Sequence, residues 1–303
     1  MSIIQYHHSA RTSRTTTYLA LAAAVLIAGC SDDGGSADEP DEDAQTEQDA
    51  GVETDGPERS TASVRFANFL PGSGAVDVCI ADGPDADFVG PIVAESGDPA
   101  IAFREIAARR DVAVAATAVI RWVDGAATDC DTALPGASDT ALDIADSGVF
   151  TVALLDADGA APSDDPTTQT FSDVSVATPD SGRFYARFFN AAVGQAGLSV
   201  KQSGCAIPFA AFENTPYGAL GMSPNDQANY FSASVTIGQT YFETDIAVCS
   251  DTTTEVGRLV MHRFNGGEIQ FIVITGDGSA EQPYRFTLCI DTEETPTRCD
   301  VLP

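Results

Sequence analysis

The stretch VRFANFLPGSGAVDVCI at residues 64–80 decides the fold, because the chain repeats it as ARFFNAAVGQAGLSVKQ at residues 186–202. The two copies align at an offset of 122 residues without a gap. Such self-similarity indicates a duplicated structural unit. Two polar side chains recur at matching places and are interpreted as structural residues: Arg65 and Asn68 in the first copy, Arg187 and Asn190 in the second.

A second pair of matching segments supports the duplication. Residues 152–159 (VALLDADG) align with residues 271–278 (FIVITGDG) at an offset of 119. One loop deletion accounts for the difference between the two offsets. The sequence therefore predicts two copies of one domain, at residues 61–179 and 180–303.

Both copies are predicted to be all-β. Short runs rich in Val, Ile, Phe, Tyr and Thr alternate with Gly, Pro, Asp and Asn clusters, which is typical of sandwiches. We expect two tandem β-sandwich domains of the immunoglobulin or transthyretin kind, with strands at residues 62–70, 75–81, 112–123, 149–155, 184–191, 230–237, 239–247, 256–264 and 268–275. Asn265-Gly266-Gly267 predicts a tight hairpin between the last two. A short turn at residues 104–110 is the only helix expected.

The repeated motif resembles a known family. The Arg-x-x-Asn pattern, followed by a glycine-bearing turn and a short Val-Asp-Val strand, is similar to the repeated domain of unknown function 4397 of bacterial cell-envelope proteins. The resemblance implies tandem β-sandwiches on a secreted protein and assigns no catalytic residues. The matching positions are Arg65, Asn68 and Asp77, and Arg187, Asn190 and Ser199.

The first thirty residues predict export and a lipid anchor. Residues 18–27 (YLALAAAVLI) are apolar but too short to cross a bilayer, which is typical of a cleaved signal. The small residues before Cys30 resemble the lipobox of bacterial lipoproteins, in which the cysteine is acylated. We expect residues 1–29 to be removed and Cys30 to hold the chain in the membrane. Ser31, in place of Asp, favours the outer membrane or the cell surface.

Residues 30–60 predict a disordered acidic linker. They contain twelve acids against Arg59 alone, and little apolar surface offsets the entropy cost of ordering. The whole chain has 45 Asp+Glu against 15 Lys+Arg, a formal net charge of −30. Such a chain repels polyanions, so the composition excludes nucleic acid as a partner.

Six cysteines remain once the lipid-bearing one is set aside, and in an exported protein they are expected to be oxidised. The offset of 119 aligns Cys130 with Cys249. Because Lys201 stands at the place of Cys79, with Cys205 four residues on, the bridges of the two copies are expected to be analogous and not superimposable. The predicted pairs are Cys79–Cys130, Cys205–Cys249 and Cys289–Cys299.

Few residues point to catalysis. No motif for a zinc site, a serine nucleophile or a phosphate loop occurs, so no cofactor and no metal are expected. His262 is interpreted as a strand-surface residue. The arginines of the one basic stretch, Arg104, Arg109, Arg110 and Arg121, are interpreted as neutralising nearby acids. Carboxylates sufficient for a glycosidase are present in turns, where solvation explains them more simply: Asp82, Asp85, Asp87, Asp156, Asp158, Asp164 and Asp165.

The resulting hypothesis is a non-enzymatic binding or interaction module anchored at the cell envelope. Loops and exposed sheet edges are the surfaces on which it would bind a glycan or an envelope protein. Two alternatives stay open: a carboxylate-based polysaccharide hydrolase, and a structural spacer without a ligand.

The lipid anchor predicts the behaviour of Cys30→Ala. We expect this variant to lose labelling by a fatty-acid analogue and to leave the membrane fraction, because the acyl chains are the anchor. Ser31→Ala is the control and keeps both label and location. A labelled Cys30→Ala chain would contradict the lipobox assignment.

Overall fold

The computed structural model describes residues 59–142, 148–163, 165–173, 179–207, 210–223, 230–235, 239–291 and 298–302. Cys30, residues 1–29, nearly all of the linker at residues 30–60, and Asp164 lie outside these ranges. The described residues all fall within one compact unit. No helix among them is long and apolar enough to cross a membrane.

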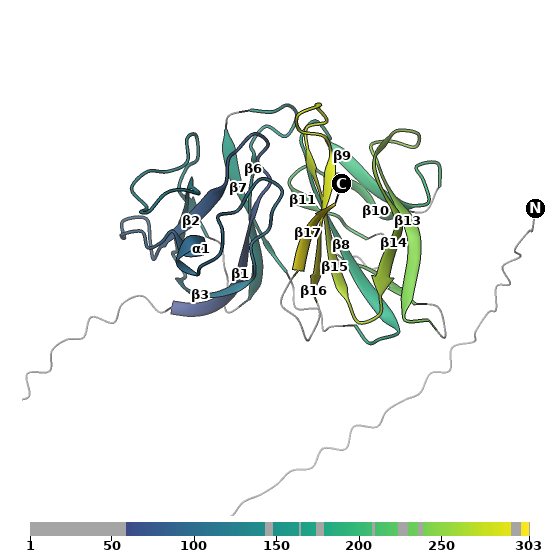
Figure 1. The fold of residues 1–303 in the computed structure, drawn as a ribbon, viewed down its shortest axis with the longest axis horizontal. Coiled ribbons are helices and arrows are strands. Elements are labelled where there is room, and N and C mark those ends of the chain that lie inside the picture. The colour runs from purple at the N-terminus through teal and green to yellow at the C-terminus, as the bar shows by residue number, and fades with distance from the viewer. Residues whose placement is uncertain are drawn as a thin grey trace, which may run out of the picture. The chain divides into compact units, whose positions relative to one another are not determined.

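The described chain is all-β, as the sequence predicts, with one four-residue helix, α1 (Ile92–Glu95). The first repeat forms two sheets (Figure 1). One has the order β3-β1-β6-β7 and consists of β1 (Arg59–Asn68), β3 (Arg110–Ala115), β6 (Val149–Asp156) and β7 (Pro166–Ser172). The other has the order β2-β4-β5 and consists of β2 (Val76–Ala81), β4 (Val119–Asp124) and β5 (Thr140–Ala141).

The second repeat also forms two sheets. One has the order β11-β8-β15-β16-β17, with β12 also on β8, and consists of β8 (Arg183–Ala192), β11 (Ala219–Leu220), β12 (Phe231–Ser234), β15 (Ile269–Gly276), β16 (Arg285–Asp291) and β17 (Arg298–Leu302). The other has the order β10-β9-β13-β14 and consists of β9 (Gly197–Gln202), β10 (Ala210–Pro216), β13 (Tyr241–Cys249) and β14 (Glu255–Asn265).

Each pair of sheets encloses a hydrophobic core of its own. In the first repeat, Phe66 of β1 and Trp122 of β4 meet edge to face, with ring centroids 6.2 Å apart. In the second repeat, Phe188 of β8 and Phe212 of β10 lie 6.1 Å apart. Successive side chains of a strand point to opposite faces, so the residues beside these core positions face away from the core.

A parallel strand pair recurs in both repeats and corrects their alignment. Phe66 pairs with Val152, and the equivalent Phe188 pairs with Ile272. Val152 therefore corresponds to Ile272, at an offset of 120 and not the predicted 119. A slip of one residue moves every side chain to the other face of a sheet. Val152 and Ile272 do lie in the two cores, whereas Phe271 points away.

The predicted hairpin at Asn265-Gly266-Gly267 is wrong. β14 pairs with β13, and β15 pairs with β8 and β16, so this turn carries the chain from one sheet of the second repeat to the other. Of the three residues, Gly267 alone has a positive φ, of 85°, whereas the type I′ hairpin turn typical of an Asn-Gly pair needs two such residues. The N–H of Gly266 donates to Thr240 and that of Gly267 to Arg183, which ties the turn to both sheets.

Two further expectations are corrected. The helical turn at residues 104–110 is absent, because Arg104 adopts a φ of 76° and Arg110 already begins β3. The strand expected at residues 112–123 is two strands, β3 and β4, joined by a turn. Among the strands that the sequence did not predict, β7 (PTTQTFS) and β10 (AAFENTP) consist largely of small and polar residues.

Candidate functional site

Arg65 and Arg187 project from the sheet face opposite the core of their own repeat. Each stands beside a core phenylalanine of its strand, Phe66 in β1 and Phe188 in β8. The alternation of side chains along a strand turns both guanidinium groups outward. Because the strands are equivalent, the two arginines emerge at equivalent places on the two repeats.

A third hydrophobic cluster joins these two outer faces. The rings of Phe69 and Phe189 lie 6.0 Å apart, and Phe171 stacks on Phe189 at 4.9 Å. The cluster contains residues of both repeats and is therefore the core of an interface between them. It leaves Arg65 only 1% exposed and Arg187 only 2% exposed.

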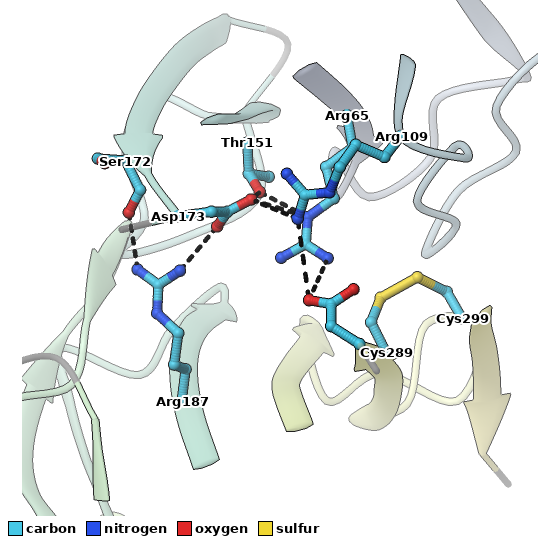
Figure 2. A network of polar contacts seen from close by, with 9 residues as sticks. Arg65, Arg109, Thr151, Ser172, Asp173, Arg187, Cys289 and Cys299 are labelled. Atoms are coloured by element: carbon cyan, nitrogen blue, oxygen red, sulfur yellow. Dashed lines mark hydrogen bonds and ion pairs between the residues drawn. A yellow bond between two sulfur atoms is a disulfide. The ribbon is translucent and has the colours of Figure 1, made fainter. Parts of the chain in front are cut away.

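Both arginines contact one carboxylate, that of Asp173, directly after β7. Arg187 donates from Nη1 to Oδ1 at 2.7 Å and from Nη2 to the carbonyl of Ser172 at 2.9 Å. Arg65 Nε lies 3.1 Å from Oδ2 and donates to the hydroxyl of Thr151 at 2.7 Å, and that hydroxyl donates to Oδ2 at 2.7 Å. Figure 2 shows the two arginines reaching the carboxylate from different sides.

A second carboxylate, Asp291 at the end of β16, completes the network. Its Oδ2 lies 3.5 Å from Arg65 Nη1 and 3.8 Å from Arg109 Nη2, and the same Nη2 lies 3.1 Å from Asp173 Oδ2. Asp173 donates its N–H to Val149, and Asp291 pairs with the equivalent Ile269. The two carboxylates therefore hold equivalent places. The first repeat offers Arg65 and Arg109 to Asp291, and the second repeat offers Arg187 to Asp173.

The arginines of the network keep the carboxyl group of Asp173 ionised. Burial by itself favours the protonated form of Asp173, but the charges of Arg65, Arg187 and Arg109 outweigh it and hold the pKa of that carboxyl below its usual value. Burial, and then the charge of Arg65, lower the pKa of the Arg109 guanidinium. Asp173 is thus ionised when the chain is folded at neutral pH. A buried guanidinium without this partner would be strongly destabilising.

The repeated motif predicts a structural role for Arg65 and Arg187 but does not identify their partners. Their main partners are the carboxylates of Asp173 and Asp291, which lie between the repeats. Asp173 and Asp291 follow strands that the sequence did not predict, so the comparison of repeats never reached them. Aligning β7 with β16 would have paired them.

Asn68 and Asn190 play the same structural part in each repeat. Both side chains are fully buried. Each amide nitrogen donates to two backbone carbonyls, and each amide oxygen accepts the N–H two residues further on, which fixes the turn after the strand. The acceptors are Gly74 and Ile101 for Asn68, and Gln195 and Thr215 for Asn190, at 3.0 to 3.1 Å.

The structure contains the three predicted disulfides, Cys79–Cys130, Cys205–Cys249 and Cys289–Cys299. The expected equivalence of Cys130 and Cys249 is wrong, however. Val123 pairs with Asp77, and Cys249 pairs with the equivalent Ser199, so Val123 holds the place of Cys249. Cys79–Cys130 and Cys205–Cys249 each join one strand cysteine to one loop cysteine, and the strand that carries the cysteine differs between the repeats.

Asp156, of the acidic turns, and His262 make local contacts within the fold. Groups of three or more His, Cys, Asp or Glu placed to hold a metal ion are absent from that part of the chain. Asp156 is buried and accepts the N–H groups of Asp158 and Ser163, so it shapes its own loop. His262 is half-buried, not on the surface, and its Nε2 lies 2.7 Å from Gln270 Oε1. Burial lowers the pKa of its imidazole.

The arginines of the basic stretch are used within the fold. Arg109 belongs to the network of Asp173. The remaining contacts are Arg104 with the carbonyl of Pro283, Arg110 with Asp98 at 3.0 Å, and Arg121 with Asp139 at 2.6 Å.

An apolar pocket of about 160 Å³ opens within the second repeat. Phenylalanine and aliphatic side chains form most of its walls, and Phe184 stacks on Phe264 at 4.4 Å and on Phe242 at 6.0 Å between ring centroids. Lys201 and Gln202 are polar members of the lining. The phenylalanines that line it are Phe184, Phe212, Phe231, Phe242 and Phe264.

A polar groove of about 440 Å³ lies between residues 98–108 and β17. Its carboxylates are Asp98, Glu105 and Asp300. Asp98 forms the ion pair with Arg110, and Glu105 accepts the N–H of Ala102 at 3.0 Å. Asp300 also interacts within the chain, so none of the three carboxylates is free.

Comparisons with known proteins give no family assignment. No family model matches the chain, and no curated protein does. Among solved structures, a fimbrial assembly protein from Parabacteroides distasonis is 12% identical, with a TM-score of 0.21, over 81% of this chain and 100% of its own. A proposed adhesin from Bacteroides ovatus is 9% identical, with a TM-score of 0.20, over 81% and 95%. At these scores the likeness carries no argument about fold or function.

The network predicts a large effect of Asp173→Asn. We expect the free energy of unfolding to fall by about 3–5 kcal/mol, because the isosteric amide leaves buried guanidinium charges uncompensated. Urea denaturation measures the change. Asp98→Asn is the control: its carboxylate is half-exposed, and loss of its pair with Arg110 costs at most about 1 kcal/mol. Equal effects in the two variants would contradict the network's role.

The lowered pKa of Asp173 also predicts a pH dependence. A carboxyl whose pKa is lower in the folded than in the unfolded chain contributes stability above its unfolded value, about 4, and loses it as pH falls through the folded value. Wild type should therefore lose stability more steeply than Asp173→Asn as pH is lowered below about 4. Denaturation at stepped pH checks this, and parallel curves would refute it.

Proposed function

We propose that this chain is a non-enzymatic interaction module of the bacterial cell envelope, and that the aromatic pocket of the second repeat holds part of its partner. The single observation that carries the proposal is this pocket. Five phenylalanines line it, and apolar walls with a few polar groups are typical of binding sites.

The size of the pocket indicates what it holds. A cavity of roughly 150 Å³ lined by apolar side chains accommodates benzene. The pocket of about 160 Å³ is therefore suited to one aromatic or branched apolar group, such as the side chain of a partner protein. An anchor of this kind carries much of the energy of an interface.

The sequence supports a location at the cell envelope and a relation to a family of envelope proteins. The signal segment, Cys30 and the acidic linker favour export and lipid anchoring at the outer membrane or the cell surface. The repeated Arg-x-x-Asn motif supports membership of both repeats in the domain of unknown function 4397. A sandwich tethered in this way would present its pocket outside the membrane. Three disulfides suit it to that compartment.

The rival hydrolase would have to act in the polar groove. Its three carboxylates are the observation in favour of a glycosidase. The engagement of all three within the chain argues against it, because a glycosidase needs two acids free to meet a sugar.

The proposal is tested with a variant whose new side chain fills the aromatic pocket. Ala233 lines it from β12, and Ala233→Phe places a phenyl ring inside, whereas Ser234→Phe places the same ring on the next, exposed residue. Both variants and wild type are measured on arrays of glycans and of short peptides. We expect wild type to select ligands with an apolar group, Ala233→Phe to bind them at least tenfold more weakly, and Ser234→Phe to match wild type.

Other outcomes identify the alternatives. Equal binding by Ala233→Phe and wild type would refute the pocket. Silence on both arrays would favour the spacer. Release of sugars from envelope polysaccharide that Asp98→Asn abolishes would favour the hydrolase.

A further inference from the structure

β7 is an outer strand of the first repeat's four-stranded sheet, next to β6 alone. Its sequence, PTTQTFS, carries no charge in a chain with 45 acids. Thr167, Gln169 and Ser172 are exposed. A straight, uncharged outer strand is a template for pairing with another chain, which natural sheets normally avoid.

The other outer strands among the described residues carry protection of that kind. β3 begins with two charged residues, Arg-Asp. β10 and β14 contain charged residues and are irregular in their pairing with the neighbouring strand. β17 also contains charged residues, and a disulfide joins it to β16. β5, β11 and β12 have two to four residues, and the edge of β2 is bridged by Val89 and Ile101. β7 has only Pro166 at its start.

The register of β7 shows which backbone groups face outward. Asp173 donates its N–H to the carbonyl of Val149, so alternate residues before it, beginning with Phe171, bond β6. Thr168, Thr170 and Ser172 therefore point their backbone groups away from β6. The outward direction of the Ser172 carbonyl is confirmed by its hydrogen bond, which it accepts from Arg187. Among the described residues, no other strand pairs with the outward side of Thr168 and Thr170.

The second repeat shows that a strand fits at this place. β16 corresponds to β7, because it pairs with β15 as β7 pairs with β6. β17 covers the outer edge of β16 as an antiparallel strand and is tied to it by Cys289–Cys299. The fold thus accepts an added antiparallel strand on one repeat, and within the described part of the chain no strand covers the equivalent edge of the other.

We propose that β7 pairs antiparallel with β7 of a second copy of this chain. The absence of charge on β7 favours this occupant. An edge that binds a basic segment would be expected to carry acidic residues. An uncharged edge instead allows two strongly acidic chains to pair without bringing carboxylates together. Threonine pairs across antiparallel strands are favourable. The docking is independent of the aromatic pocket.

One register uses all the outward backbone groups of Thr168 and Thr170. If Thr168 faces Thr170 of the other copy, both N–H and both carbonyl groups of these residues are paired on each side, and the Thr170 carbonyl exchanges its long contact of 3.4 Å with Gln169 Nε2 for a backbone N–H. A register centred on Thr170 would instead require the carbonyl of Ser172, which Arg187 occupies, and one centred on Thr168 would require an N–H from Pro166. Gln169 then lies opposite Gln169 at the two-fold axis.

Disulfide trapping in the full chain tests this register. Six of the seven cysteines are bridged, so Gln169→Cys adds an exposed thiol opposite its own copy, at the Cα separation of about 4.5 Å expected for such a pair. Mild oxidation should give a covalent dimer on a non-reducing gel at least tenfold faster than for Thr167→Cys. Thr167 is equally exposed but lies about 13 Å from its own copy in this register.

Controls separate pairing from chance collision. In the Gln169→Cys background, Thr170→Pro removes an outward N–H without breaking a bond within the chain and should abolish the dimer, whereas Thr170→Ala should keep it. The unmodified chain reports any contribution of Cys30. Equal rates for the two thiols, no dimer, or a cross-link to a different protein would each overturn the proposal.

Discussion

The carboxylate of Asp173 connects the two repeats, because it binds an arginine from each of them. Its two oxygens meet arginines that stand at the same place in two copies of one motif, and all three side chains are almost completely buried. A charge withdrawn from water in this way is tolerated only with partners at hydrogen-bond distance. The network therefore fixes how the two sheets meet, and the aromatic cluster around Phe189 excludes water from it.

The sequence repeat allowed much of the fold and two residues of the network to be predicted, but an error in its alignment also made part of the prediction wrong. Arg65 and Arg187 were found because they recur, and the all-β fold because short β-rich runs alternate with turn residues. The alignment failed by one residue in β15, where the pattern VALLD matches FIVIT almost equally well in either register. The choice is made by which face packs on the core, and that depends on strands distant in the sequence.

The errors at turns and cysteines have similar causes. Asn265-Gly266-Gly267 has the composition of a hairpin turn, but the strands that it joins find their partners elsewhere, so local turn chemistry did not decide the pairing. The cysteine pairs were predicted from an even number and from an alignment of Cys130 with Cys249. Their geometric equivalence was not predictable, because β2 and β13 carry the strand cysteine in different repeats. The aromatic pocket was not predictable either, since its five rings come from strands of both sheets.

The exchange of arginine and aspartate between the repeats has a consequence for how such a protein grows. Each repeat gives an arginine to a carboxylate of the other, as the subunits of a two-fold dimer do, although the apolar residues around these groups differ between the repeats. An interface of that kind closes on itself, unlike the head-to-tail contact of a solenoid. A further copy of the repeat would find the arginine-bearing faces of these two already buried against each other, so it would have to attach through a different surface.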